Sequence, residues 1–226
     1  MPPERQPIEA MDLEVPGFGS AIVVLPADRN RPRPVLIAAH GAGDGPRWQC
    51  EVWSTIVAGR GFILCPRGVP FTPGVDEAGH FFRDHHYLGR LVTAALAALR
   101  KQHGDLVGSG PVVYTGYSQG AAMGALFANR HPELFPRMVL IEGGHREWDM
   151  ATARSFHRGG GARVLFACGG RYCANSARKA QRWLERAGVG ARVEHIEGGG
   201  HTYGGSVAER VAAAFDWVVE GDARWK

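Results

Sequence analysis

The sequence has 226 residues, with 26 lysines and arginines against 22 aspartates and glutamates. The net charge of +4 is spread along the chain rather than gathered in a basic stripe, which argues against nucleic-acid binding. No apolar run approaches the roughly 20 residues that cross a bilayer, so no membrane span is expected. The length predicts a single domain over residues 1–226.

Apolar segments of strand length alternate with segments of helical period. Several strand segments are continuously apolar, which is typical of strands covered on both faces. The alternation predicts an α/β fold with a mainly parallel, doubly wound sheet flanked by helices, and ligands at the carboxyl ends of the strands. The expected strands are 21–25, 34–40, 62–65, 111–117, 138–141, 163–167 and 192–196, and the expected helices are 88–101, 121–130, 174–187 and 206–219.

A glycine-rich loop follows the second expected strand and reads His40-Gly41-Ala42-Gly43-Asp44-Gly45. A dinucleotide fingerprint would need its third glycine at the position of Pro46, so phosphate binding is not expected here. The glycines let the backbone approach a ligand closely. We expect the amide of Ala42, or alternatively that of Gly41, to face a developing negative charge, and His40 to brace the loop.

Residues 69–87 follow the next strand without a clear period and are expected to form a long surface loop. Its aromatic residues suggest an apolar wall beside a substrate. The residue types of His80, Asp84, His85 and His86 can bind zinc, but no second ligand cluster accompanies them. We therefore expect no metal and no other cofactor.

The most informative motif is Gly116-Tyr117-Ser118-Gln119-Gly120, which joins an expected strand to an expected helix. A serine in so sharp a turn is held in a strained conformation with its hydroxyl exposed, and small neighbours leave room for it. This context predicts that Ser118 is a nucleophile and that the amide of Gln119 is a second donor to an oxyanion.

Near the carboxyl end, His201 follows a strand and a glycine run and precedes the last expected helix. A serine hydroxyl needs an adjacent imidazole to accept its proton, and in this type of fold the base comes last in chain order. His201 is therefore the expected base.

These motifs resemble the α/β-hydrolase superfamily, specifically its small lidless esterases and its dienelactone-hydrolase-like or depolymerase-like members. The resemblance extends from Val35 to Trp217 and is most specific at residues 116–120, 40–43 and 200–201. It implies a single domain without a large lid and a carboxylic ester hydrolase that acts on a small-molecule ester through an acyl-enzyme, without a cofactor. A peptidase or amidase on the same fold, and a binding protein that has lost its acid, remain alternatives. The oligomeric state stays open.

The chain departs from many members of this superfamily after the strand at 163–167, where no aspartate follows. The acid that orients His201 must then come from another loop. Glu142 directly follows the preceding strand and is the first candidate, with Asp149 as the alternative. If Glu142 does not orient His201, we expect it to be a surface residue or a salt-bridge partner of Arg171.

The four cysteines leave the compartment open. Cys50 can pair with Cys65 and Cys168 with Cys173, or all four can remain reduced. Pairing would suit an exported protein, whereas reduced thiols would suit the cytoplasm.

Overall fold

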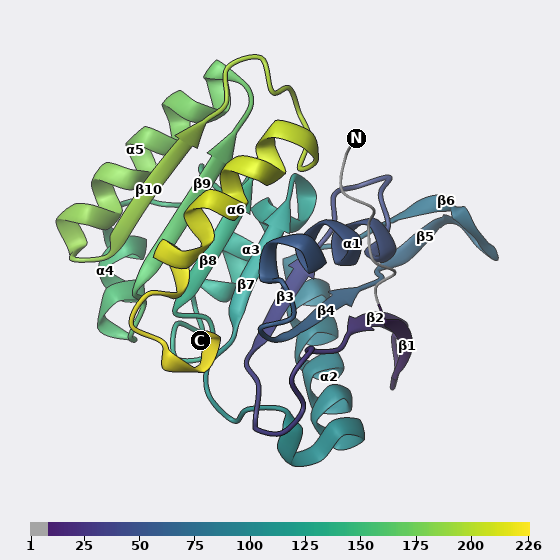
Figure 1. The fold of residues 1–226 in the computed structure, drawn as a ribbon. Helices are drawn as coiled ribbons and strands as arrows, with labels where there is room; N and C mark the ends of the chain where they lie inside the picture. The colour runs from purple at the N-terminus through teal and green to yellow at the C-terminus, as the bar shows by residue number, and fades with distance from the viewer. Residues whose placement is uncertain (1–8) are drawn as a thin grey trace, which may run out of the picture.

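The computed structural model describes residues 9–226, and a mixed sheet forms the centre of this part of the chain (Figure 1). Eight strands within it lie in the order β1-β2-β4-β3-β7-β8-β9-β10. From β4 to β10 all neighbours are parallel, whereas β1 and β2 form an antiparallel edge. The strands are β1 Ala10–Val15, β2 Gly19–Val24, β3 Val35–Ala39, β4 Phe62–Pro66, β7 Val113–Tyr117, β8 Arg137–Ile141, β9 Arg163–Cys168 and β10 Gly190–His195.

Helices cover both faces of this sheet. In Figure 1, α1 and α6 lie across the near face, and their buried side chains share one apolar core. Side chains of α2, α3, α4 and α5 form the core on the opposite face. The helices are α1 Pro46–Val57, α2 His85–His103, α3 Gln119–Ala128, α4 Met150–Arg158, α5 Arg171–Ala187 and α6 Gly205–Val219, and two short 3-10 turns lie at Gly104–Leu106 and Ala223–Trp225.

The strand β3 shows why its sequence is continuously apolar. Its side chains alternate between the faces, so Val35 and Ile37 enter one core while Leu36 and Ala38 enter the other. All of them are buried. The predicted fold class, a mainly parallel doubly wound sheet of the α/β-hydrolase type, is confirmed.

The prediction of a long surface loop at residues 69–87 is wrong. Val69–Thr72 (β5) and Val75–Phe81 (β6) form an antiparallel hairpin, and α2 already begins at His85. The pair Pro73-Gly74 makes the turn, with Gly74 at a φ of 78° that glycine adopts without strain. The hairpin stands away from the main sheet in Figure 1.

Both cysteine pairs that the sequence allows are disulfide-bonded. Cys50 in α1 is joined to Cys65 in β4, and Cys168 at the end of β9 is joined to Cys173 in the first turn of α5. In residues 9–226, no helix combines the length and apolarity needed to cross a membrane.

Candidate active site

Ser118 lies at the carboxyl end of β7, directly before α3. Its backbone has φ 49° and ψ −109°, a conformation that is strained for any residue with a Cβ. A Cβ on Gly116 would lie 2.5 Å from the carbonyl carbon of Gly120, and one on Gly120 would lie 2.5 Å from the carbonyl oxygen of Ala39. The turn therefore requires glycine on both sides of the serine, as the motif predicted.

The imidazole of His201 lies against this serine. Its Nε2 is 2.9 Å from Ser118 Oγ. The Tyr117 hydroxyl donates a hydrogen bond of 2.8 Å to the carbonyl of His201, and Gly200 forms a β-bridge with Gly169. These contacts hold the loop that carries His201, while 58 % of its side chain stays exposed. The pair of side chains is thus open to molecules from solution.

Glu142 lies on the other side of the imidazole. Its Oε2 is 3.2 Å from His201 Nδ1, and its Oε1 accepts a hydrogen bond from the amide of Gly169. The residue follows β8 with φ 51°, and its side chain is only 7 % exposed. Because both carboxylate oxygens have partners, the position of this group is well determined.

The structure does not bring Asp149 to His201. Asp149 caps the amino end of α4 by accepting a hydrogen bond of 2.7 Å from the amide of Thr152. Arg171 pairs with Glu197 at 3.1 Å rather than with Glu142. Of the two carboxylates that the sequence singles out, only Glu142 contacts the imidazole.

The loop after β3 passes beside the serine. A Cβ on Gly41 would lie 3.2 Å from the Cβ of Ser118. Neighbouring amides are engaged, since Gly43 donates to the carbonyl of His80 at 2.9 Å and Gly120 to that of His40 at 3.1 Å. In contrast, the amides of Ala42 and Gln119 donate to no acceptor within residues 9–226. The same holds in this part of the chain for the amide of Gly41, the alternative donor, so all three candidate donors are free to bind another group.

His40 braces this loop from beneath. The imidazole is fully buried, with Nδ1 2.7 Å from the carbonyl oxygen of Gly41 and Nε2 2.6 Å from that of Arg67. It stacks on Phe82 with the ring centres 4.5 Å apart. Burial lowers the pKa of His40. This is the bracing role that the sequence suggested rather than that of a base.

Sequence reasoning missed three hydrogen bonds that the hairpin and the residue after it make with the site. The carbonyl and amide of His80 form hydrogen bonds with Gly43 and Asp44, at 2.9 and 2.8 Å, so β6 is joined to the loop after β3. The side chain of Gln119 accepts a hydrogen bond of 2.8 Å from the amide of Phe82. The turn signal at Pro73-Gly74 could have revealed the hairpin.

Two of the residues whose types could bind zinc, His80 and Asp84, have other roles in the structure. His80 is buried, and Asp84 caps α2 by accepting from the amide of Tyr87. Within the described residues, the one group of three potential ligands is Glu142 with Cys168 and Cys173. Those two sulfur atoms are bonded to each other, so they are not available as thiolates.

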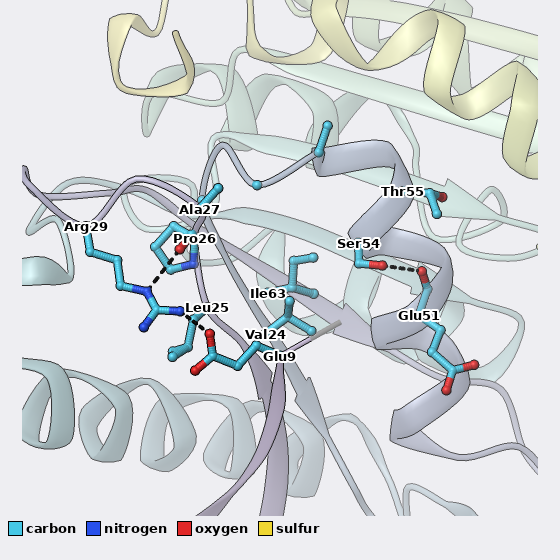
Figure 2. A pocket seen from close by; sticks show the side chains of 13 residues that line it. Glu9, Val24, Leu25, Pro26, Ala27, Arg29, Glu51, Ser54, Thr55 and Ile63 are labelled. Atoms are coloured by element: carbon cyan, nitrogen blue, oxygen red, sulfur yellow. Dashed lines mark hydrogen bonds and ion pairs between the residues drawn. The ribbon is translucent and has the colours of Figure 1, made fainter. Parts of the chain in front are cut away.

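A cavity of about 690 Å³ lies elsewhere, between the end of β2 and the second half of α1 (Figure 2). An ion pair between Arg29 and Glu9 crosses one side of it, and the hydroxyl of Ser54 bonds to the carbonyl of Glu51. Neither Ser118 nor His201 lines this cavity. It is separate from the candidate active site.

Comparison with known proteins shows the family to which the chain belongs. A family model described as the alpha/beta hydrolase fold matches residues 41–167. Since that is more than half of the chain, the protein belongs to the α/β-hydrolase fold family. No curated protein matches the sequence.

Solved structures of similar architecture include several hydrolases. A substrate-bound, fluorophosphonate-binding serine hydrolase F from Staphylococcus aureus has a TM-score of 0.67 and 13% identity, with 93% of this chain and 97% of that chain covered. Esterase PE8 has a TM-score of 0.64 and 19% identity, with 92% and 100% covered. An S-formylglutathione hydrolase from Staphylococcus aureus has a TM-score of 0.64 and 15% identity, with 94% and 96% covered. At these identities the likeness establishes a shared fold.

Proposed function

We propose that the protein is a serine hydrolase that cleaves carboxylic esters, with Ser118 as nucleophile, His201 as base and Glu142 as the acid that orients the base. The observation that carries this proposal is the unbroken series of contacts from Ser118 Oγ through both nitrogens of His201 to Glu142. With the proton on Nδ1 held by the carboxylate, Nε2 is free to accept the serine proton.

The first half of the reaction forms an acyl-enzyme. Ser118 Oγ attacks the carbonyl carbon of the ester while its proton passes to His201 Nε2. The negative charge that develops on the carbonyl oxygen is held by the amide of Ala42 in the loop after β3 and by that of Gln119, the first residue of α3. The bond to the alcohol oxygen then breaks, and His201 returns the proton to the departing alkoxide.

The second half regenerates the enzyme. Water attacks the acyl carbon, giving one proton to His201, and the bond to Ser118 Oγ breaks as that proton returns to the serine. The products are a carboxylic acid and an alcohol. None of these steps needs a metal or an organic group. The exposed His201 supports entry of the substrate directly from solution.

The test compares wild-type protein with Ser118→Ala on p-nitrophenyl acetate, butyrate and octanoate. We expect the variant to show only background hydrolysis, because no acyl-enzyme can form without the hydroxyl. A fluorophosphonate probe should label the wild type alone. Equal turnover by both proteins would contradict the proposal, and preference for a matched p-nitroanilide would indicate an amidase. No labelling and no turnover by the wild type would indicate a binding protein.

The two disulfides support placing the enzyme in an oxidising compartment, since such bonds persist where the thiol pool does not reduce them. Fractionation of cells that produce the untagged protein, with detection in each compartment, would test this part of the proposal.

A further inference from the structure

The Cys168–Cys173 loop, residues 168–173, runs from the last residue of β9 into the first turn of α5 and lies where many members of this fold carry their acidic residue. Here it contains no carboxylate, but it still contacts the acid. The amide of Gly169 donates to Glu142 Oε1, so this loop supplies the carboxylate's second partner.

The same residue also contacts the loop that bears the base. Gly169 forms a β-bridge with Gly200, which directly precedes His201. A Cβ on Gly169 would lie 2.6 Å from the amide nitrogen of Gly200, so the two backbones pack directly against each other. One backbone position therefore holds the acid and the base relative to one another.

The disulfide closes this loop right beside the acid. Cys168 is the last residue of β9, and Cys173 lies in the first turn of α5, so the bond joins the two ends of the loop. Both cysteines are buried, with exposed fractions of 1% and 6%. Their sulfur atoms and a carboxylate oxygen of Glu142 all lie within 4.8 Å of one another.

We propose that the Cys168–Cys173 disulfide is a positioning element of the active site, which keeps the Gly169 amide on Glu142 and thereby keeps His201 aligned with Ser118. The proposal rests on the proposed function. When the bond is opened, Glu142 loses its fixed second partner and the bridge to Gly200 loosens. The imidazole then spends less time in line with the serine, and turnover falls without a matching change in substrate binding.

Opening the bond requires a dithiol as reductant. One thiolate of the dithiol attacks the sulfur of Cys173 and releases Cys168 as a thiol after it takes up a proton. The second thiol of the dithiol then displaces Cys173, so the products are two cysteine thiols and the oxidised, cyclic dithiol. A small-molecule disulfide such as oxidised glutathione, which is reduced to two thiols as the protein bond re-forms, should restore turnover.

The chain carries its own control in the second disulfide. The bond between Cys50 in α1 and Cys65 in β4 lies in the core that α1 and α6 share, and within residues 9–226 neither cysteine has a hydrogen bond or ion pair with Ser118, His201 or Glu142. Its sequence separation is 15, against 5 for the other pair, so it restrains the unfolded chain more strongly. A purely stabilising role would give the larger effect to this control bond.

The experiment compares two double variants. The first carries Cys168→Ala and Cys173→Ala together, and the control carries Cys50→Ala and Cys65→Ala together. For the first we expect kcat to fall by about 10²-fold, because small displacements of reacting groups have effects of that size. Its KM should stay within about twofold of the wild-type value, as expected when only transition-state interactions are lost. The control should keep its kcat and show the larger fall in thermal midpoint. Unchanged kcat in the first variant would overturn the proposal.

If the first variant does not fold, reduction of the wild-type enzyme provides a second test of the proposal. Samples treated with dithiothreitol are alkylated, and mass spectrometry measures how much of each disulfide is open. We expect kcat to follow the closed fraction of Cys168–Cys173 and to return on reoxidation, whereas dependence on Cys50–Cys65 alone would reject the proposal. Because Ser118→Ala tests the chemistry separately, an inactive Ser118→Ala beside a fully active reduced enzyme would reject this inference and leave the proposed function standing.

Discussion

At the scale of single residues, strained backbone gathers where the chemistry is proposed. Among the described residues, three with a Cβ have positive φ, and two of them are Ser118 and Glu142, at 49° and 51°. Conformations of this kind cost about 1–3 kcal/mol each and persist only where the surroundings enforce them. Glycine leaves room for them here, since a Cβ on Gly143 would lie 2.5 Å from the carbonyl oxygen of Ser118. Both side chains therefore project from the sheet edge at fixed positions.

Glu142→Gln should lower kcat by roughly 10⁴-fold, as loss of the orienting carboxylate does in comparable sites. The glutamine oxygen can still accept from Gly169, but its NH₂ group cannot accept the Nδ1 proton of His201. The tautomer of His201 with its proton on Nδ1 then loses the hydrogen bond that stabilises it. Steady-state kinetics with p-nitrophenyl butyrate provides the measurement.

Asp149→Asn is the matched control for this substitution. Asparagine also caps helices, so α4 should remain intact and kcat should stay near the wild-type value. A large loss with Asp149→Asn together with an active Glu142→Gln would contradict the assignment of the acid.

At the scale of elements, the β5–β6 hairpin positions the loop after β3. The hairpin itself carries no candidate catalytic side chain. The backbone of His80 is joined to Gly43 and Asp44 by two hydrogen bonds. The close approach depends on Gly79, where a Cβ would lie 2.5 Å from the carbonyl oxygen of Gly43. The free amide of Ala42 belongs to this same loop, so the hairpin sets where that amide points.

Gly79→Ala should therefore lower kcat by up to about 10²-fold, the effect of losing one donor to an oxyanion. Gly74→Ala is its control, because both glycines have φ 78° and only Gly79 lacks room for a Cβ. Both variants place alanine at the same φ, whereas the displacement of Gly43 is specific to the first. Similar kcat values for the two purified variants would show that the hairpin does not position the loop.

Three further elements escaped the sequence reading although their patterns are present. Met11, Leu13 and Val15 alternate with acidic residues in β1, as in an edge strand with one buried face. The buried residues of α1 recur at helical spacing after a proline at its first turn. Asp149 precedes α4 as a helix cap. Short amphipathic segments of this kind are easily taken for loops, because few residues define their period.

At the scale of the whole molecule, the burial of titratable side chains affects how stability responds to pH. Burial lowers the pKa of His40, His103 and His145. The native state then binds fewer protons than the unfolded state at a pH below about 6.5, the ordinary pKa of histidine. Stability should therefore fall as the pH decreases through this range. Burial raises the pKa of Glu147, which acts in the opposite direction.

Urea unfolding at about pH 7.5 and about pH 5.5 measures this effect, and the midpoint should be lower at the acidic pH. Replacing both His103 and His145 by Gln should reduce the difference between the two midpoints. An equal or higher midpoint at the acidic pH would contradict the prediction. The same curves test whether residues 1–226 form one domain, which predicts a single cooperative transition; residues 1–8 lie outside the described part of the chain.

Local patterns of the sequence by themselves determined the alternation of strands and helices, the turn at Ser118 and the place of His201 after the glycine run. Each of these follows from backbone preferences and burial over a few neighbouring residues. The fold class follows as well, since continuously apolar strands need cover on both faces.

Only the tertiary structure decided which carboxylate contacts His201, and that the Gly169 amide donates to this carboxylate beside the Cys168–Cys173 disulfide. These contacts join segments far apart in the chain, brought together by the order of β7, β8 and β9 in the sheet. Glu142 and Asp149 are both acidic and both follow β8, so residue type cannot separate them. The difference is that Glu142 directly follows the end of the strand and points toward the neighbouring loop, whereas Asp149 caps a helix.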